Sequence, residues 1–427
     1  MSDCVEAEQA LIGGLLIDSS VITEVDVEPS DFGNANYAAI FEAIKGIQSE
    51  GEVADVFTVA DRLNRGSEQN WLPSLAAIQK NTISTRNIGT YSKHIKRFAV
   101  ERKATLIAQD LLEALRHDGL SAVDAAISQL MALESTPRKS THTLKESLRA
   151  AMDHIEKIQG MDGLSGVRTG LTELDDLMGG FHDSDLCIIG ARPAMGKTGL
   201  LINLALNSNI PCGIFSTEQA HDQIALRSIS MTGSVNSQNL RTAKLNDNDW
   251  AGITAALGLL AEKHVFIDDK SRPTIAQVCR QARKWKLKHG IKILYVDYIQ
   301  RLQATDTRLP KHQQVEEIVV GLKTLAKELD IPIVALAQVN REVEKRTDRR
   351  PGMGDLKDSG AIEQEADEII MLYRDEVYNP DTEFKGIAEL NIEKNRHGPI
   401  GCVKAAWIGQ YMRFEDLKPD EYWRERQ

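Results

Sequence analysis

The sequence of 427 residues lacks the features that mark several large classes of protein. No apolar run approaches the roughly 20 residues of a membrane-spanning helix. The N-terminal residues MSDCVEAEQ are acidic and lack the basic start of a secretory signal. The five cysteines are scattered and form no C-x-x-C pair, which argues against a zinc finger or a disulfide framework. These absences predict a cytoplasmic protein with no membrane partner.

Basic side chains are outnumbered by acidic ones. The net charge is −11, so the chain is not coated with the basic groups that attract nucleic acids. This balance does not exclude DNA held in a narrow channel that a few local basic side chains line. The length allows two or three domains with cores of their own. Composition therefore leaves the function open.

Residues 1–134 are predicted to form a small all-α N-terminal domain. Apolar residues recur at helical spacing in the segments 37–47 and 88–115. No catalytic constellation is visible in this part of the sequence. A packing or partner-docking role is therefore the simplest interpretation.

Residues 135–168 are predicted to form a linker that contains one amphipathic helix. The start of this segment is polar and carries a proline, and a capping-box pattern follows at residues 143–146. The helix carries one apolar stripe, made by Leu144, Leu148, Met152 and Ile155. Such a stripe must be buried somewhere. Periodicity leaves open whether it packs on its own chain or on a neighbouring subunit.

Residues 169–427 alternate between apolar strands and helices. This alternation predicts an α/β domain with a mainly parallel sheet and helices on both faces. The strand-like runs are residues 186–190, 213–217, 265–268, 291–298, 331–336 and 368–373. Ligands of such sheets bind at the carboxyl ends of the strands.

The strongest motif is GARPAMGKT, which follows the first strand and precedes an apolar helix. This is the setting that a phosphate-binding loop, or P-loop, requires. Backbone N–H groups would hold phosphates, Lys197 would reach the β- and γ-phosphates of ATP, and the Thr198 hydroxyl would hold Mg²⁺. One departure is that Ala191 stands where the general pattern has glycine. The predicted nucleotide-binding residues are Ala191, Arg192, Pro193, Ala194, Met195, Gly196, Lys197 and Thr198.

Three other strands end in polar side chains that suit the same chemistry. Asp297 is a candidate partner of Mg²⁺, and Glu218 is a candidate to orient or deprotonate the attacking water. Gln338 is a candidate sensor of the γ-phosphate. Each residue alone could be an ordinary strand end, but a P-loop on the same sheet favours one shared site.

Two basic segments are candidates for contact with other molecules. The run 341–354, which includes Arg346 and Arg350, is rich in Lys, Arg and Gly, and it follows the strand that ends in Gln338. It is a candidate DNA-facing loop, with a solvated loop as the alternative. Lys394 and Arg396 lie two apart at the end of a late strand, where alternate side chains point the same way. They suit phosphate charge, although ordinary surface charge is the alternative.

In this order, the motifs resemble those of the DnaB family of replicative helicases, whose ATPase core is RecA-like. The likeness begins at residues 6–11, resumes at 169–175 and runs to about residue 416. The most specific stretches are residues 191–198, 355–367 and 394–399.

The resemblance implies a role for each matching position. Glu218 corresponds to the catalytic glutamate, although Gln219 stands where the family usually has Met. Asp297 matches the Walker B aspartate and Gln338 the sensor glutamine. The remaining matches are Arg227, a second arginine of the Glu218 motif; Lys394 and Arg396, which reach the neighbouring subunit's ATP; and Lys357, Asp358, Ser359 and Gly360, a loop that tracks single-stranded DNA.

The resemblance also implies how the protein assembles and works. It implies a homohexameric ring that moves 5′ to 3′ on single-stranded DNA, with ATP and Mg²⁺ as cofactors. Primase and a helicase loader are the implied protein partners, and the linker helix is expected to dock on the next subunit. No cysteine-rich primase module is present, so priming must come from another protein.

Two other functions share part of this pattern. A RecA-like recombinase has the same ATPase core, but it forms filaments and does not need the helical domain with its linker helix. A nucleotide-gated DNA-binding or loader protein would bind ATP and DNA without unwinding activity. Electron microscopy separates filaments from rings, and an unwinding assay identifies a factor that cannot unwind.

Overall fold

The computed structural model describes residues 2–65, 70–82, 85, 87–116, 122–123, 126, 129–130, 133, 143–159, 164–306, 308–356 and 359–417. The chain divides into two compact units, residues 1–142 and 143–427. Within the described ranges, no helix has the length and hydrophobicity that a membrane span needs.

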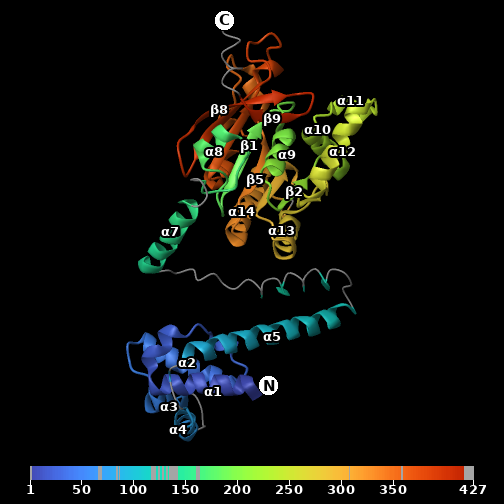
Figure 1. Ribbon diagram of the computed structural model, residues 1–427. Helices are drawn as coiled ribbons and strands as arrows, with labels where there is room; N and C mark the ends of the chain where they lie inside the picture. Colours follow the sequence, from blue (N-terminus) through green and yellow to red (C-terminus); the bar gives the residue numbers. More distant parts are fainter. Residues whose placement is uncertain are drawn as a thin grey trace. The chain divides into compact units, whose positions relative to one another are not determined.

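The N-terminal unit is helical, as the sequence predicts (Figure 1). Its helices are α1 (Ser2–Ile17), α2 (Ala35–Ser49), α3 (Val56–Asn64), α4 (Leu72–Lys80) and α5 (Ile88–Ala114), with short 3₁₀ helices η1 (Ser19–Glu24) and η2 (Pro29–Asp31). Apolar faces of α1 to α5 form one buried core. The buried carboxylate of Glu8 accepts hydrogen bonds from the backbone N–H groups of Gly33 and Asn34, at 2.6 and 3.1 Å. This carboxylate therefore ties α1 to the start of α2.

The second unit contains a nine-stranded sheet among its described residues. The strands, in spatial order, are β3 (Val265–Asp268), β2 (Cys212–Ser216), β4 (Ile293–Asp297), β5 (Ile333–Gln338), β1 (Leu186–Ala191), β6 (Glu368–Tyr373), β7 (Ile387–Asn395), β8 (Gly401–Ile408) and β9 (Arg413–Asp416). The first six of these are parallel, and β7 to β9 extend the sheet antiparallel. The mainly parallel α/β prediction is confirmed.

Helices cover both faces of this sheet (Figure 1). One face packs on α8 (Thr172–Met178), α9 (Lys197–Asn207) and α10 (His221–Gly233), and the other on α13 (Ile275–His289), α14 (Lys311–Leu329) and α15 (Ser359–Glu365). Along β1, Leu186 and Ile188 face the helices α13 to α15, whereas Cys187 and Ile189 face the helices α8 to α10. A strand buried on both faces has no polar alternation, which explains the continuous apolar runs in the sequence.

The remaining elements connect or flank these layers. They are α7 (Leu144–Gln159), α11 (Ser237–Thr242), α12 (Asp247–Ala261), η3 (Ile299–Arg301), η4 (Arg341–Lys345), η5 (Met353–Asp355) and η6 (Asp375–Val377). The predicted strand at 291–298 is shorter, and the one predicted at 331–336 ends two residues later. Strands β8 and β9 were not predicted, and many of their residues are only partly buried.

Candidate nucleotide-binding site

The P-loop joins the end of β1 to the start of α9. Gly196 caps α9 with φ of 96°, a left-handed conformation that glycine adopts without steric cost. Ala194 also has a positive φ, of 70°, although it carries a Cβ. The first backbone N–H groups of a helix have no partner within it. The loop therefore presents amide groups at a helix N-terminus, where anions bind.

Two arginines support the P-loop. The buried guanidinium of Arg192 donates to the Val339 carbonyl at 2.9 Å and to Glu344 at 2.8 Å. Arg374 donates to the carbonyl oxygens of Ala194 and Met195 at 3.3 and 3.4 Å. The guanidinium of Arg192 is thus engaged with protein groups, and Arg374 is a supporting residue that the sequence did not reveal.

Oxygen ligands for a hard cation lie beside the loop. The hydroxyl of Thr198 donates to Oδ2 of Asp297, at the end of β4, at 2.6 Å. Thr217 holds the backbone of Asp297, because its N–H and hydroxyl donate to the Asp297 carbonyl at 2.7 and 2.8 Å. The ammonium of Lys197 donates to the Ala337 carbonyl at 3.3 Å and lies over the Tyr298 ring. Neighbouring parallel strands therefore bring the predicted residues together.

Burial shifts the charges at this site toward their neutral forms. Burial lowers the pKa of Lys197, against the opposing attraction of Asp297 and Glu218. Burial likewise raises the pKa of Asp297, against the hydrogen bond from Thr198 and the charge of Lys197. Burial also lowers the pKa of Arg227. Phosphates and a divalent cation would compensate these partly desolvated charges.

A cavity of about 370 Å³ lies beside these groups. Predicted residues in its lining are Arg192, Pro193, Ala194, Gly196, Lys197, Thr198, Glu218, Arg227 and Gln338. Ala191, Met195 and Asp297 are buried and lie outside this lining. The cavity is also lined by residues that were not among the predicted site residues, which are Gly199, Gln219, Tyr298, Trp407 and Met412.

Lys394 and Arg396 do not line this cavity. The ammonium of Lys394 donates to the Glu363 carbonyl at 2.7 Å, and the guanidinium of Arg396 pairs with Asp367 at 3.0 Å. The Arg396 side chain remains 67% exposed. The argument from strand alternation does not hold here, because β7 ends at Asn395 and its pairing with β6 shifts register near Lys394.

The arginines of the candidate DNA-facing loop have partners within the chain. Arg346 binds both carboxylate oxygens of Asp355, at 2.5 and 2.9 Å. Arg350 binds both oxygens of Glu389, at 2.7 and 2.8 Å. Both acids are buried. The Arg350 pair fastens the loop to β7, whereas the Arg346 pair joins the loop to η5. Of the other DNA-binding candidates, Lys357 and Asp358 lie outside the described residues, whereas Ser359 and Gly360 begin α15.

Together, the P-loop on β1, acidic residues at the ends of β2 and β4, and the amide at the end of β5 define a RecA-like P-loop ATPase. Two family models match the chain: the DnaB-like helicase C terminal domain over residues 166–416 and the DnaB-like helicase N terminal domain over residues 2–97. The chain belongs to the DnaB family of replicative DNA helicases.

Individual relatives resemble the chain over nearly its full length. Replicative DNA helicase DnaB of Geobacillus stearothermophilus is 36% identical, covering 97% of this chain and 94% of its own. Replicative DNA helicase DnaC of Bacillus subtilis (strain 168) is 35% identical with the same coverage. The chain is accordingly an ATP-dependent replicative DNA helicase.

Solved structures also match this chain, and they include a DnaB-like helicase and an ATPase domain. One is a DnaB-like replicative helicase described with its interactions with primase. It matches with a TM-score of 0.70 and 30% identity, covering 96% of this chain and 99% of that one. Another is described as an ATPase domain. It matches with a TM-score of 0.63 and 34% identity, covering 65% of this chain and 100% of that one.

Proposed function

We propose that the protein works as a homohexameric ring that moves 5′ to 3′ along single-stranded DNA and unwinds duplex at the replication fork. The observation that carries this proposal is the division of the ATPase groups. Lys197, Thr198, Glu218 and Gln338 line one cavity, whereas Arg396 is exposed outside it. Because Arg396 lies outside the cavity of its own subunit, we propose that it acts on the ATP of another subunit.

Within one subunit, each group has a chemical role. Thr198 and Asp297 would hold Mg²⁺, because their oxygens lie 2.6 Å apart and oxygen ligands suit this cation. Mg²⁺ would neutralise charge on the phosphate oxygens. Lys197 would add a positive charge to the β- and γ-phosphates. Glu218 would orient or deprotonate the attacking water, Arg227 would add charge to the phosphates, and Gln338 would sense the γ-phosphate.

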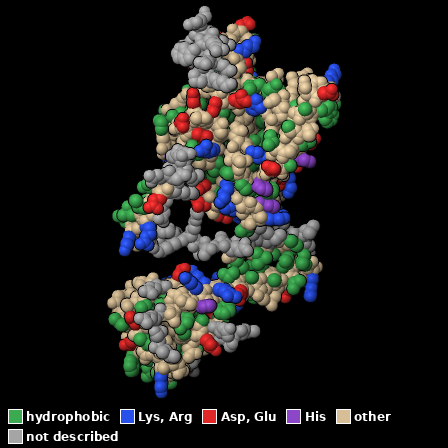
Figure 2. Space-filling view, in the orientation of Figure 1, with side chains coloured by type: hydrophobic (Ala, Val, Ile, Leu, Met, Phe, Trp, Pro, Cys, Tyr) green, Lys and Arg blue, Asp and Glu red, His purple; other side chains and the backbone are tan. Residues whose placement is uncertain are grey.

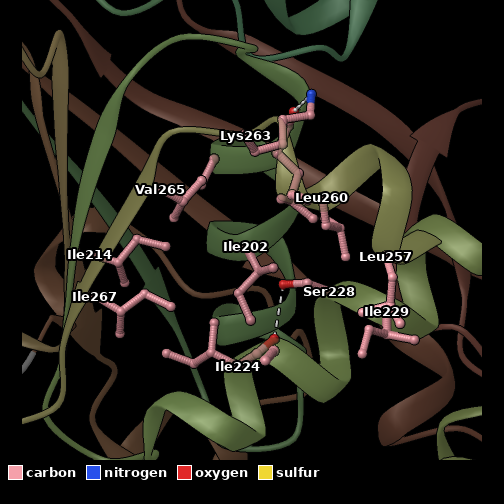
Figure 3. A pocket seen from close by; sticks show the side chains of 14 residues that line it. Ile202, Ile214, Ile224, Ser228, Ile229, Leu257, Leu260, Lys263, Val265 and Ile267 are labelled. Atoms are coloured by element: carbon pink, nitrogen blue, oxygen red, sulfur yellow. Dashed lines mark hydrogen bonds between the residues drawn. The ribbon is translucent and has the colours of Figure 1, made fainter. Parts of the chain in front are cut away.

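The linker helix α7 supports assembly into a ring. Leu144, Leu148, Met152 and Ile155 are between 55% and 76% exposed, and hydrophobic side chains are visible at the surface of α7 in Figure 2. The ATPase unit has an apolar cavity of about 300 Å³ between α9, α10 and α12 (Figure 3). Because burying apolar surface is favourable, we propose that α7 of one subunit docks on this region of the next.

The N-terminal unit is the proposed docking site for primase. A similar solved helicase is described with its interactions with primase. In this chain, Val53 and Phe57 are each 72% exposed beside the start of α3. Large exposed apolar side chains suit a protein partner. A helicase loader is the second proposed partner.

The test of this function is unwinding of forked DNA with both tail polarities. We expect a substrate with a free 5′ tail to be unwound when ATP and Mg²⁺ are present. A substrate with only a 3′ tail should remain double-stranded, as should either substrate with a non-hydrolysable ATP analogue. Unwinding only from a 3′ tail would contradict the polarity, and ATPase activity without any unwinding would favour a loader-type factor. Electron microscopy of the same sample should show closed rings rather than filaments.

The DNA-contacting loop gives a separate prediction. Lys357→Glu should weaken single-stranded DNA binding. The slope of log K against log salt concentration should also become less steep, by up to about 0.7 per lost phosphate contact. ATPase without DNA should persist. The matched control is Lys288→Glu, which makes the same charge change at an exposed position on α13. Titrations of labelled oligonucleotide at several salt concentrations measure both effects, and equal affinities for the two variants would contradict the assignment.

Arg346 and Arg350 are less suitable for this test. Removing either arginine would leave a buried carboxylate, Asp355 or Glu389, without its partner. An unpaired buried charge is destabilising. A loss of DNA affinity in these variants would therefore combine a lost DNA contact with a disturbed loop.

A further inference from the structure

A cluster of histidines and acids lies at the edge of the sheet opposite the P-loop. His182 and Asp185 precede β1, and His397 follows β7. One ligand atom from each of the three lies within 4.8 Å of the others. Since β1 has six residues, this edge lies about 20 Å from the P-loop. The cluster is therefore separate from the nucleotide site of its own chain.

The geometry brings two imidazoles to one carboxylate. Nε2 of His397 lies 2.5 Å from Oδ2 of Asp185. The rings of His182 and His397 are 4.3 Å apart, with an angle of 31° between their planes. The Asp185 side chain is 11% exposed, whereas His397 is 39% exposed. The carboxylate is thus held inside, and an ion could enter past His397.

Glu368 holds His182 in place from the first residue of β6. Its Oε1 lies 3.4 Å from Nδ1 of His182, and Ser165 contacts Nε2 of the same ring at 2.7 Å. An ion bound at Nε2 would therefore replace the contact with Ser165. Glu368 is fully buried, and its other oxygen, Oε2, has no hydrogen-bond partner among the described residues. A carboxylate behind a histidine commonly orients that ring at metal sites.

The basic side chains around the cluster engage one oxygen of Asp185, and His397 contacts the other. Asp185, Asp367 and Glu368 are buried acids, and the cations paired with them are Lys323 and Arg396. Lys323 lies 3.3 Å from Oδ1 of Asp185, which leaves Oδ2 for the histidine side.

We propose that His182, Asp185 and His397 bind a zinc-class transition metal ion, with Glu368 as a positioning residue for His182. Two imidazole nitrogens and one carboxylate oxygen suit Zn²⁺, whereas Mg²⁺ prefers oxygen ligands alone. The ion would fasten the segment after β7 to the turn before β1. It would thereby connect residues that are 212 positions apart in the chain.

The test uses the full-length protein without an affinity tag, treated with chelator and titrated with ZnCl₂ by calorimetry in excess Mg²⁺. We expect one Zn²⁺ per chain from this site. His397→Asn and, separately, His182→Gln should each weaken that binding by more than about 100-fold, because each removes a ligand. Zinc should raise the melting temperature of the original protein and leave that of folded His397→Asn unchanged.

The matched control is His221→Asn. His221 also pairs with a carboxylate, Asp269 at 2.8 Å, but it is 74% exposed, and no second histidine joins the pair among the described residues. This variant should keep the zinc site. Titration with CoCl₂ should give a tetrahedral spectrum without a thiolate charge-transfer band, since no cysteine is a ligand. Absence of saturable binding, retention of the site in both ligand variants, or a thiolate band would overturn the proposal.

Discussion

Arg396→Ala should assemble into rings and bind ATP but hydrolyse it about 10³–10⁵-fold more slowly, the usual contribution of an arginine finger. The guanidinium would neutralise charge that develops on the transferring phosphate of the adjacent subunit. The physical reason for action in trans is its position. Arg396 lies outside the cavity that holds Lys197, and its side chain is 67% exposed. Steady-state ATPase assays, with nucleotide binding measured separately, test this directly.

A mixing experiment separates action in trans from action within one subunit. Lys197→Ala and Arg396→Ala are each expected to be inactive. In a mixed ring, some interfaces combine an intact Lys197 with an intact Arg396 from the neighbour, so basal ATPase should partly return. Unwinding need not return, because movement could require every site.

The control for this experiment is Arg272→Ala, which removes an exposed arginine elsewhere on the ATPase unit and should leave ATPase unchanged. Formation of mixed rings is checked with differently tagged subunits. If verified mixed rings regain no ATPase activity, either Arg396 acts within its own subunit or hydrolysis requires every interface of the ring to be complete. Full activity of Arg396→Ala alone would show that the finger assignment is wrong.

Glu218→Gln should bind ATP and lower its turnover by about 10²–10⁴-fold, the usual contribution of a general base. The amide preserves the shape of the side chain but cannot accept a proton from water at neutral pH. Glu218 lines the same cavity as Lys197 and Thr198 and is exposed to it at the end of β2. ATP should therefore remain bound, which a filter-binding or fluorescent-nucleotide assay detects beside the ATPase measurement.

The matched control is Glu262→Gln, which makes the same chemical change at an exposed position after α12. Its turnover should equal that of the unmodified protein. Normal turnover in Glu218→Gln would move the role of base to another group. Loss of ATP binding in the same variant would instead indicate that Glu218 supports the cavity rather than the chemistry.

The parts of this protein that could be predicted from its sequence are those whose neighbours in space are also neighbours in the chain. The strand, loop and helix around Lys197 are contiguous, so their residue pattern reports the P-loop directly. The buried strands were recognisable because both faces of each are covered, which requires an unbroken apolar run. Asp297 and Glu218 could be predicted to share one site because parallel strands end at a common edge.

Only the tertiary structure shows which residues that are distant in the sequence come into contact. Trp407 and Met412 line the nucleotide cavity because β8 and the turn that follows it return beside the P-loop, which no local pattern reports. The same holds for Arg350 with Glu389, and for Asp185 with His397, 212 positions later. Such pairs depend on the order of strands in the sheet. Packing of whole elements fixes that order, and the side-chain pattern of any single segment does not contain it.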